Sequence, residues 1–146
     1  MSKLNTDHLE QRIKTLEYSI EHLLSSQADS IEYEVFRNAT IKGFELTLEI
    51  CGKLLRKALK NYAGNPYLID ELTYKDLFRY AGKHLLFDNQ TIERWFAYRN
   101  NRNNTALDYG IAFATITIKL LPTFLQDARE LKRILNVKFG SNHVKS

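Results

Sequence analysis

Apolar side chains recur at intervals of three and four residues through most of this chain, and this spacing constrains its fold more than any other feature. Leu9, Ile13, Leu16, Ile20 and Leu23 form the first such stripe, which predicts an amphipathic helix over about residues 5–26. Only two prolines and six glycines interrupt the 146 residues, whereas a β-sandwich needs frequent turns. The sequence therefore predicts an all-α fold.

A second, longer helix is predicted from the next part of the chain. Asp29 and Glu32, three residues later, fit a capping box at its start. The apolar pattern then continues on more than one face as far as Gly64-Asn65-Pro66, a turn that ends a helix. The residues from this turn to Leu72 are expected to form a loop.

Two shorter helices are predicted to follow. Thr73 is a suitable N-cap for a helix over residues 74–85, and Asp88-Asn89 is a suitable start for the next one. Six consecutive polar residues at positions 100–105 then interrupt the apolar pattern. Asparagine and threonine favour caps and local hydrogen bonds over helix interiors, so we expect the chain to turn within this cluster.

The last helix is predicted over about residues 106–135, with a kink at Pro122. Residues 115–118 include β-branched side chains that also suit a strand, but a single strand would have no partner in this sequence, so the helical interpretation is preferred. We expect the five helices to form an antiparallel up-down bundle in one domain, residues 1–136, followed by a flexible C-terminal tail, residues 137–146.

The composition narrows the class of protein. Apolar residues make up 44% and charged residues 26% of the chain, a balance that excludes wholesale disorder. Cys51 is the single cysteine, so neither a disulfide within the chain nor a zinc site built on several cysteines is expected. The sequence has no leader-like or membrane-spanning apolar stretch, and we expect a cytoplasmic protein without a metal or cofactor. The net charge of +4 permits an anionic partner without requiring one.

Charged and polar residues gather between positions 99 and 109, at the predicted junction of two helices. Arg99 and Arg102 carry guanidinium groups that suit phosphate or carboxylate, and the neighbouring asparagines, Asn103 among them, can add amide hydrogen bonds. Ligand sites often lie between the helices of a bundle. Asparagines are equally common in capped turns, so the residues alone leave both an anion site and a plain turn open.

The same segment carries a family resemblance. The sequence from Arg94 to Gly110, RWFAYRNNRNNTALDYG, resembles the signature of HEPN-domain proteins, in particular the toxin of HEPN–MNT toxin–antitoxin modules and the related nucleotidyltransferase substrate-binding-like proteins. The family motif is an arginine followed by a polar residue, a histidine four to six positions after the arginine, and a tyrosine two positions further on. Arg102, Asn103 and Tyr109 match this motif, whereas Leu107 stands at the position of the histidine.

The resemblance implies a metal-independent endoribonuclease. In such an enzyme Arg102 would hold the scissile phosphate, Arg99 and Asn103 would add contacts to phosphate or RNA, and the residue at position 107 would be the general acid–base. Leucine transfers no proton, and loss of a positioned acid–base group typically lowers the rate by ~10²–10⁴. We therefore expect this chain to be a form inactivated at Leu107, which cleaves RNA very poorly or not at all.

The resemblance also implies partners. These are a second copy of the chain in a homodimer with a shared cleft, an RNA substrate such as tRNA or mRNA, and an MNT-domain nucleotidyltransferase antitoxin. In a type VII-like module this antitoxin would neutralise the toxin by AMPylation, the transfer of AMP onto Tyr109. The added nucleotide would lie beside Arg102 and compete with RNA for the phosphate site.

Alternative interpretations remain open at this point. Because Leu107 removes the residue that separates a nuclease from a binding protein, the chain is alternatively a non-enzymatic nucleotide- or substrate-binding partner of a nucleotidyltransferase. Trp95 and Phe96 would be a platform for stacking RNA bases or part of the bundle core. The basic residues of the second helix would line the path of an RNA backbone or form a solvated face; they are Lys53, Arg56, Lys57 and Lys60.

Overall fold

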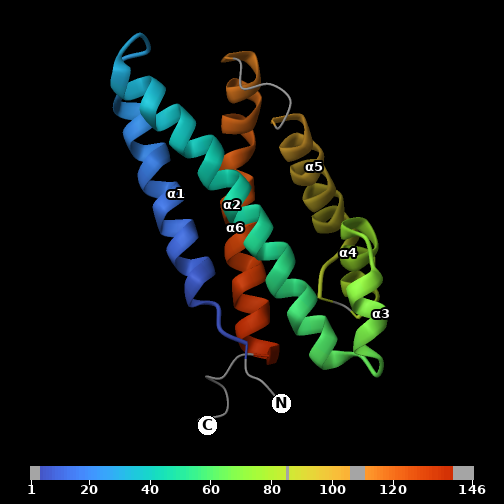
Figure 1. The fold of residues 1–146 in the computed structure, drawn as a ribbon. Helices are drawn as coiled ribbons and strands as arrows, with labels where there is room; N and C mark the ends of the chain where they lie inside the picture. Colours follow the sequence, from blue (N-terminus) through green and yellow to red (C-terminus); the bar gives the residue numbers. More distant parts are fainter. Residues whose placement is uncertain (1–3, 85, 106–110, 140–146) are drawn as a thin grey trace.

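The computed structural model describes residues 4–84, 86–105 and 111–139, and this part of the chain is helical with short connections (Figure 1). The helices are α1 (Asp7–Ser25), α2 (Ile31–Tyr62), α3 (Pro66–Glu71), α4 (Tyr74–Lys83), α5 (Asn89–Thr105) and α6 (Ile111–Phe139). In Figure 1, α1, α2, α5 and α6 alternate in direction, and α3 and α4 lie together beside the lower half of α2. The all-α, antiparallel up-down bundle predicted from the sequence is confirmed.

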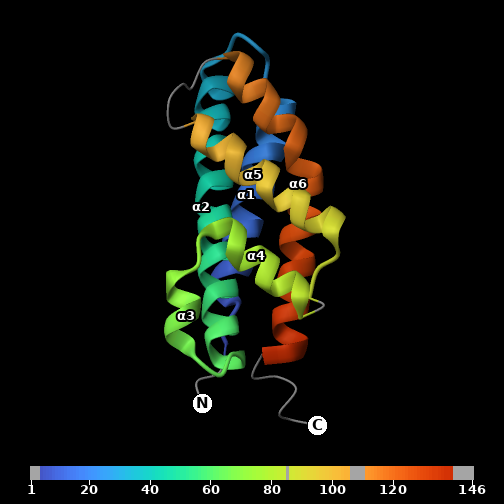
Figure 2. The same cartoon turned by 90° about the vertical axis from the view of Figure 1, so that its right-hand side faces the viewer.

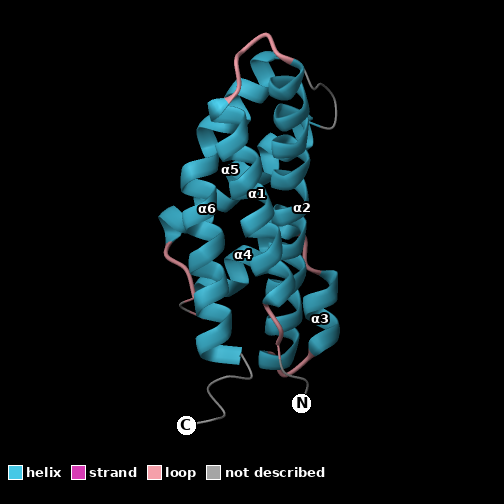
Figure 3. Cartoon of the chain, turned by 90° about the vertical axis from the view of Figure 1, so that its left-hand side faces the viewer, coloured by secondary structure: helices cyan, strands magenta, loops and turns pink. Residues whose placement is uncertain are grey.

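Helix α2 is the centre of the bundle. It contacts each of the other described helices, which explains why its apolar residues occupy more than one face. Phe44, Leu48, Cys51 and Leu55 are all buried in the core. Viewed from the side opposite to α4 and α5, α1, α2 and α6 stand side by side along the bundle (Figure 3), and the main-chain N–H of Leu4 donates to the Phe139 carbonyl where the first and last described segments meet.

Side-chain caps mark the starts of α2, α4 and α5. Thr73 Oγ1 accepts from the Asp76 N–H at 3.1 Å and Asp88 Oδ1 accepts from the Thr91 N–H at 2.8 Å, as predicted. The predicted capping box of Asp29 and Glu32 is wrong, because Ser30 is the N-cap of α2 and its hydroxyl accepts from the Tyr33 N–H at 3.0 Å.

The segment between α2 and Thr73 contains a helix, and the prediction of a loop up to Leu72 is wrong. Asn65 Oδ1 accepts from the Tyr67 N–H at 3.1 Å, and Pro66 occupies the first helical position. Proline at this position has no N–H to leave unpaired, and its fixed φ suits a helix start. The buried side chain of Ile69 then anchors α3 to the core. The Gly64-Asn65-Pro66 turn thus ends one helix and starts another.

Helix α5 continues through the asparagine cluster to Thr105, so the predicted turn within residues 100–105 is wrong. Asn101 is buried and its Nδ2 donates to Thr117 Oγ1 on α6 at 3.0 Å, which compensates a polar side chain inside the bundle. Residues 106–110, which include Leu107 and Tyr109, lie outside the described part of the chain.

The last helix matches its prediction in type and ends further along the chain than predicted. Residues 115–118 are helical, as preferred over a strand, and Pro122 lies inside α6. The helix continues to Phe139, so the first three residues assigned to the flexible tail are helical, whereas residues 140–146 are outside the described residues. No helix in the described ranges has both the length and the apolar character needed to cross a membrane.

Candidate functional site

A pocket of about 340 Å³ lies between α2, the start of α4, and α5. Figure 2 shows α4 and α5 one above the other on the same side of the bundle, with α2 beside them. We call it the Arg102 pocket after the motif arginine that lines it. Its volume is near the lower end of the range of roughly 300–1,000 Å³ that is usual for small-molecule sites.

Helix α2 supplies one wall of the Arg102 pocket. Glu49, Gly52, Lys53 and Arg56 line it, and their spacing of three, one and three residues places them on one stripe of the helix. Gly52 leaves this wall open at its middle, since a β-carbon there would meet only the Tyr74 ring, at 3.8 Å. The charged groups on either side of Gly52 therefore face the same space.

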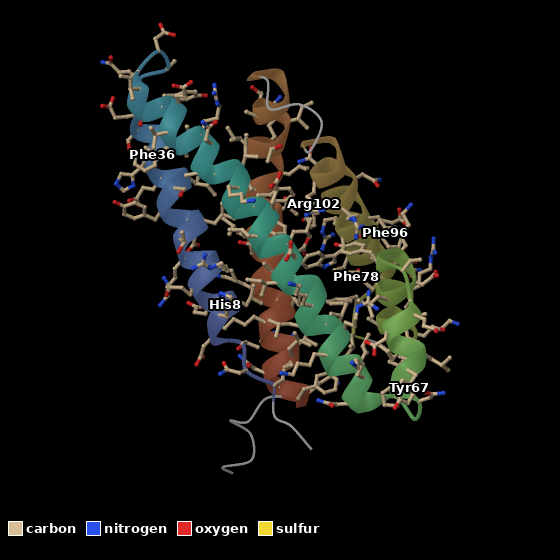
Figure 4. The ribbon with its side chains drawn as sticks, in the orientation of Figure 1. His8, Phe36, Tyr67, Phe78, Phe96 and Arg102 are labelled. Carbon is tan, nitrogen blue, oxygen red and sulfur yellow. The ribbon has the colours of Figure 1, made fainter. Side chains whose placement is uncertain are left out.

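Helix α5 supplies the opposite wall through Arg99 and Arg102, which are one turn apart. Arg102 Nη2 lies 3.8 Å from Glu49 Oε2, and the Arg99 guanidinium lies 4.8 Å from the centre of the Tyr74 ring in a cation–π contact. Figure 4 places Arg102 between α2 and α5. The pocket therefore brings together the two arginines that the sequence predicted as phosphate ligands.

The third wall is mostly apolar. It comes from the α3–α4 junction and the first turn of α4, and consists of Leu72, Thr73, Tyr74 and Leu77. The Tyr74 hydroxyl donates to the Trp95 carbonyl at 3.2 Å, and burial raises the pKa of Tyr74 far above its usual value. Tyr74 is therefore a neutral packing residue of this wall and does not act as a base.

The charge in the Arg102 pocket is predominantly positive. Among the residues that the structure describes, four cationic side chains line it, those of Lys53, Arg56, Arg99 and Arg102, against the single carboxylate of Glu49. A hydrogen bond from Lys53, whose Nζ is 3.0 Å from Glu49 Oε1, lowers the pKa of Glu49, with further contributions from the charges of Lys53 and Arg102. The site is suited to an anion of more than one charge.

A partly buried polar network joins α6 to α5, the helix that carries both arginines. Arg94 donates to both carboxylate oxygens of Asp127 on α6, through Nε at 2.8 Å and Nη2 at 3.0 Å. The Tyr98 hydroxyl donates to the same carboxylate at 2.5 Å. Since Asp127 is buried and Tyr98 is almost fully buried, these bonds fix one face of α5 on α6 and leave the other face toward α2.

A second hollow continues from the Arg102 pocket along α2. Lys53 and Arg56 line both, and the second also includes Lys57, Lys60 and Asp70. Two of its cations have partners on α3: Lys60 Nζ is 3.0 Å from Asp70 Oδ1, and Arg56 Nη1 donates to the Ile69 carbonyl at 2.6 Å. The four basic residues singled out in the sequence thus line two neighbouring hollows that share Lys53 and Arg56, and we call this row of residues the α2 basic strip.

Comparison with known proteins identifies the family. The model of the family described as "Nucleotidyltransferase substrate binding protein like" matches residues 4–137. The chain belongs to this family. Among solved structures it resembles HI0074 from Haemophilus influenzae, described as revealing the fold of a substrate-binding domain of a nucleotidyltransferase, with a TM-score of 0.80 and 23% identity over 90% of this chain and 99% of that one. No curated protein sequence matches this one closely.

Membership in the nucleotidyltransferase substrate-binding-like family confirms the HEPN-like helical type that the motif indicated. Of the motif residues, Arg102 lines the pocket, whereas Leu107 and Tyr109 fall outside the described residues, as does the side chain of Asn103. No histidine lines the pocket in the described ranges, and no group of three or more His, Cys, Asp or Glu that could hold a metal occurs there either.

Burial decides between the two interpretations of Trp95 and Phe96, a platform for RNA bases or part of the core. Trp95 is fully buried and stacks on Phe78 at 5.1 Å between ring centres, and Phe96 is 8% exposed, so the core interpretation of this pair is correct. Cys51 is buried in the core as well. Sequence reasoning did not single out Glu49 or Tyr74. The spacing of Glu49 four residues before Lys53 is a signal that could have drawn attention to Glu49, while Tyr74 carries no such signal.

Proposed function

We propose that this family member is the non-catalytic binding subunit of a nucleotidyltransferase and that its Arg102 pocket holds a phosphate group of the bound molecule. The observation that carries the proposal is the convergence of four cations from α2 and α5 on one pocket of nucleotide-like size. Arginine pairs with phosphate through two parallel hydrogen bonds, and Arg99 and Arg102 are one helical turn apart.

The side chains at the pocket support binding rather than chemistry. General acid–base catalysis at neutral pH needs a group that titrates near that pH. The pKa of Glu49 is lowered by Lys53 and that of Tyr74 is raised by burial, which moves both away from neutrality. Position 107, where the ribonuclease motif has a histidine, is Leu107 in this sequence.

The proposed partner is a separate nucleotidyltransferase chain, consistent with the family description and with the description of HI0074 as the fold of a substrate-binding domain. In this arrangement the partner supplies the catalytic groups, while this chain orients the phosphate-bearing molecule for transfer. The homodimer and the cytoplasmic location expected from the sequence are part of the same proposal.

Calorimetric titration with AMP and ATP tests the phosphate site. We expect Arg102→Ala to weaken binding by roughly 10- to 100-fold, because it removes a charge-assisted contact. The control is Arg133→Ala, which removes the same charge from an exposed pair with Glu130 on α6 and should leave affinity within about twofold. If the wild type and Arg102→Ala bind AMP and ATP with equal affinity, the Arg102 pocket is not the phosphate site.

A second candidate function is the ribonuclease toxin, and the α2 basic strip favours it. The α2 basic strip extends the row of cations from the Arg102 pocket into the neighbouring hollow, as a backbone of several phosphates requires. In this candidate the antitoxin would be an MNT nucleotidyltransferase that AMPylates Tyr109, and Leu107 would be the inactivating residue.

The ribonuclease candidate is tested by restoring the missing group. Leu107→His should cleave total RNA in the presence of a chelator, at least ~10²-fold faster than the unchanged chain, since a positioned acid–base residue contributes typically 10²–10⁴. Leu107→His combined with Arg102→Ala is the matched control and should be inactive. If a folded Leu107→His protein leaves RNA intact on a denaturing gel, only the binding function stands.

A further inference from the structure

Glu49 is the one side chain whose charge does not suit a simple phosphate site. Among the described residues it is the single carboxylate that lines the Arg102 pocket, where it lies on the same stripe of α2 as Lys53 and Arg56. A carboxylate next to a bound phosphate repels it. The part of the ligand that lies next to Glu49 should therefore be an uncharged or positively charged group.

The two oxygens of Glu49 have different surroundings. Oε1 lies 3.0 Å from Lys53 Nζ, whereas Oε2 lies 3.8 Å from Arg102 Nη2, longer than a hydrogen bond. The Lys53 contact therefore orients the carboxylate, while Oε2 keeps lone pairs for a further donor. The side chain is 46% exposed, so a ligand in the pocket can reach it.

We propose that Glu49 accepts a hydrogen bond from a ribose hydroxyl and thereby makes the Arg102 pocket a site for a ribonucleotide unit. A carboxylate that accepts from the ribose 2′-hydroxyl is a recurring device in nucleotide sites, and this hydroxyl distinguishes ribonucleotides from deoxyribonucleotides. The inference rests on the proposed phosphate site and adds the sugar that accompanies the phosphate.

The other walls fit the remaining parts of one nucleotide. Arg99 and Arg102 provide the phosphate contacts on α5, opposite Glu49, so a sugar bonded to that phosphate lies next to the carboxylate. Leu72, Tyr74 and Leu77 form the apolar wall against which a base can pack. A volume of about 340 Å³ accommodates one nucleotide unit, either free or at the end of an RNA chain.

A different role for Glu49 would give a different result. If the carboxylate only neutralised Lys53 and Arg102, it would compete with every anion alike. Its removal would then tighten the binding of ribonucleotides, deoxyribonucleotides and inorganic phosphate by similar factors. The ratio of ribonucleotide to deoxyribonucleotide affinity separates the two roles, because repulsion between charges does not depend on the 2′-hydroxyl.

The test is calorimetric titration of the full chain with AMP, 2′-deoxy-AMP and inorganic phosphate. We expect the wild type to bind AMP about tenfold more tightly than 2′-deoxy-AMP, as one hydrogen bond to a charged acceptor allows. In Glu49→Ala the ratio should fall to about one, while phosphate binding is retained or increased. Glu130→Ala is the matched control, since Glu130 has a similar exposure of 49% and pairs with Arg133 on α6, and it should keep the wild-type ratio.

The outcomes are distinguishable. Equal affinity of the wild type for AMP and 2′-deoxy-AMP, or an unchanged ratio in Glu49→Ala, overturns the role of Glu49 and leaves the phosphate site intact. Absence of binding to all three ligands overturns the proposed phosphate site, and the ribose inference with it. Once the ratio has supported Glu49, a short oligoadenylate identifies the source of the ribose: tighter binding than AMP indicates an RNA end, and equal binding indicates a free nucleotide.

Discussion

At the scale of single residues, the buried carboxylate of Asp127 joins α6 to α5. It accepts hydrogen bonds from Nε and Nη2 of Arg94 and from the Tyr98 hydroxyl. We predict that Asp127→Ala lowers the free energy of unfolding by about 2–4 kcal/mol, since it leaves a buried hydroxyl and a half-buried guanidinium without their acceptor. Tyr98→Phe should cost about 1–2 kcal/mol, because it removes one donor and leaves the Arg94 pair in place.

Urea unfolding of both variants measures these losses, with the exposed Glu130→Ala as the control that should stay within about 0.5 kcal/mol. If Asp127→Ala is as stable as this control, then the network does not hold α5 on α6. The same result would remove the physical reason for the orientation of Arg99 and Arg102 toward α2.

At the scale of helices, local signals in the sequence identified the apolar stripes and some of the helix starts correctly. The periodic apolar residues identified α1 and α2, and Thr73 and Asp88 marked the starts of α4 and α5 because the cap bonds join residues three apart. Two of the errors were local, since Ser30 caps α2 in place of Asp29, and Asn65 with Pro66 starts α3. The turn predicted within residues 100–105 is wrong because of a tertiary contact. Asn101 is a turn residue by its local preference, but Thr117 on α6 provides a buried partner, and α5 therefore continues past it.

The same limit applies to the candidate site. Arg99 and Arg102 could be predicted because they share one helix and one motif, whereas Glu49 lies more than 50 positions away and reaches Arg102 only once α2 and α5 are packed. The position of Tyr74 depends in addition on α3, a helix that was not predicted from the sequence. Helix α3 and its connection determine where α4 begins beside α2. Residues on separate helices come together only through the packing of those helices, and a local sequence pattern does not predict that packing.

At the scale of the whole molecule, the Arg102 pocket joins three helices, so its ligand should stabilise the entire bundle. The charged residues come from α2 and α5 and the apolar wall from the start of α4, and unfolding separates all three. A ligand that binds only the folded state at about 100 times its Kd adds about 2.7 kcal/mol. For a chain of this size each kcal/mol raises the Tm by roughly 2–4 °C, so we predict an increase of about 5–10 °C with saturating AMP.

Thermal unfolding with and without AMP measures this increase, and Arg102→Ala and Arg133→Ala are the paired variants. Both remove one positive charge, but only Arg102 lines the pocket, while Arg133 pairs with Glu130 on the surface of α6. At the same AMP concentration, the roughly 10- to 100-fold weaker binding expected for Arg102→Ala should therefore reduce the increase in Tm to about half or less, whereas Arg133→Ala should keep it. An equal response in both would indicate that AMP acts through the net charge of +4 rather than through a built site, since general screening does not depend on which cation is removed.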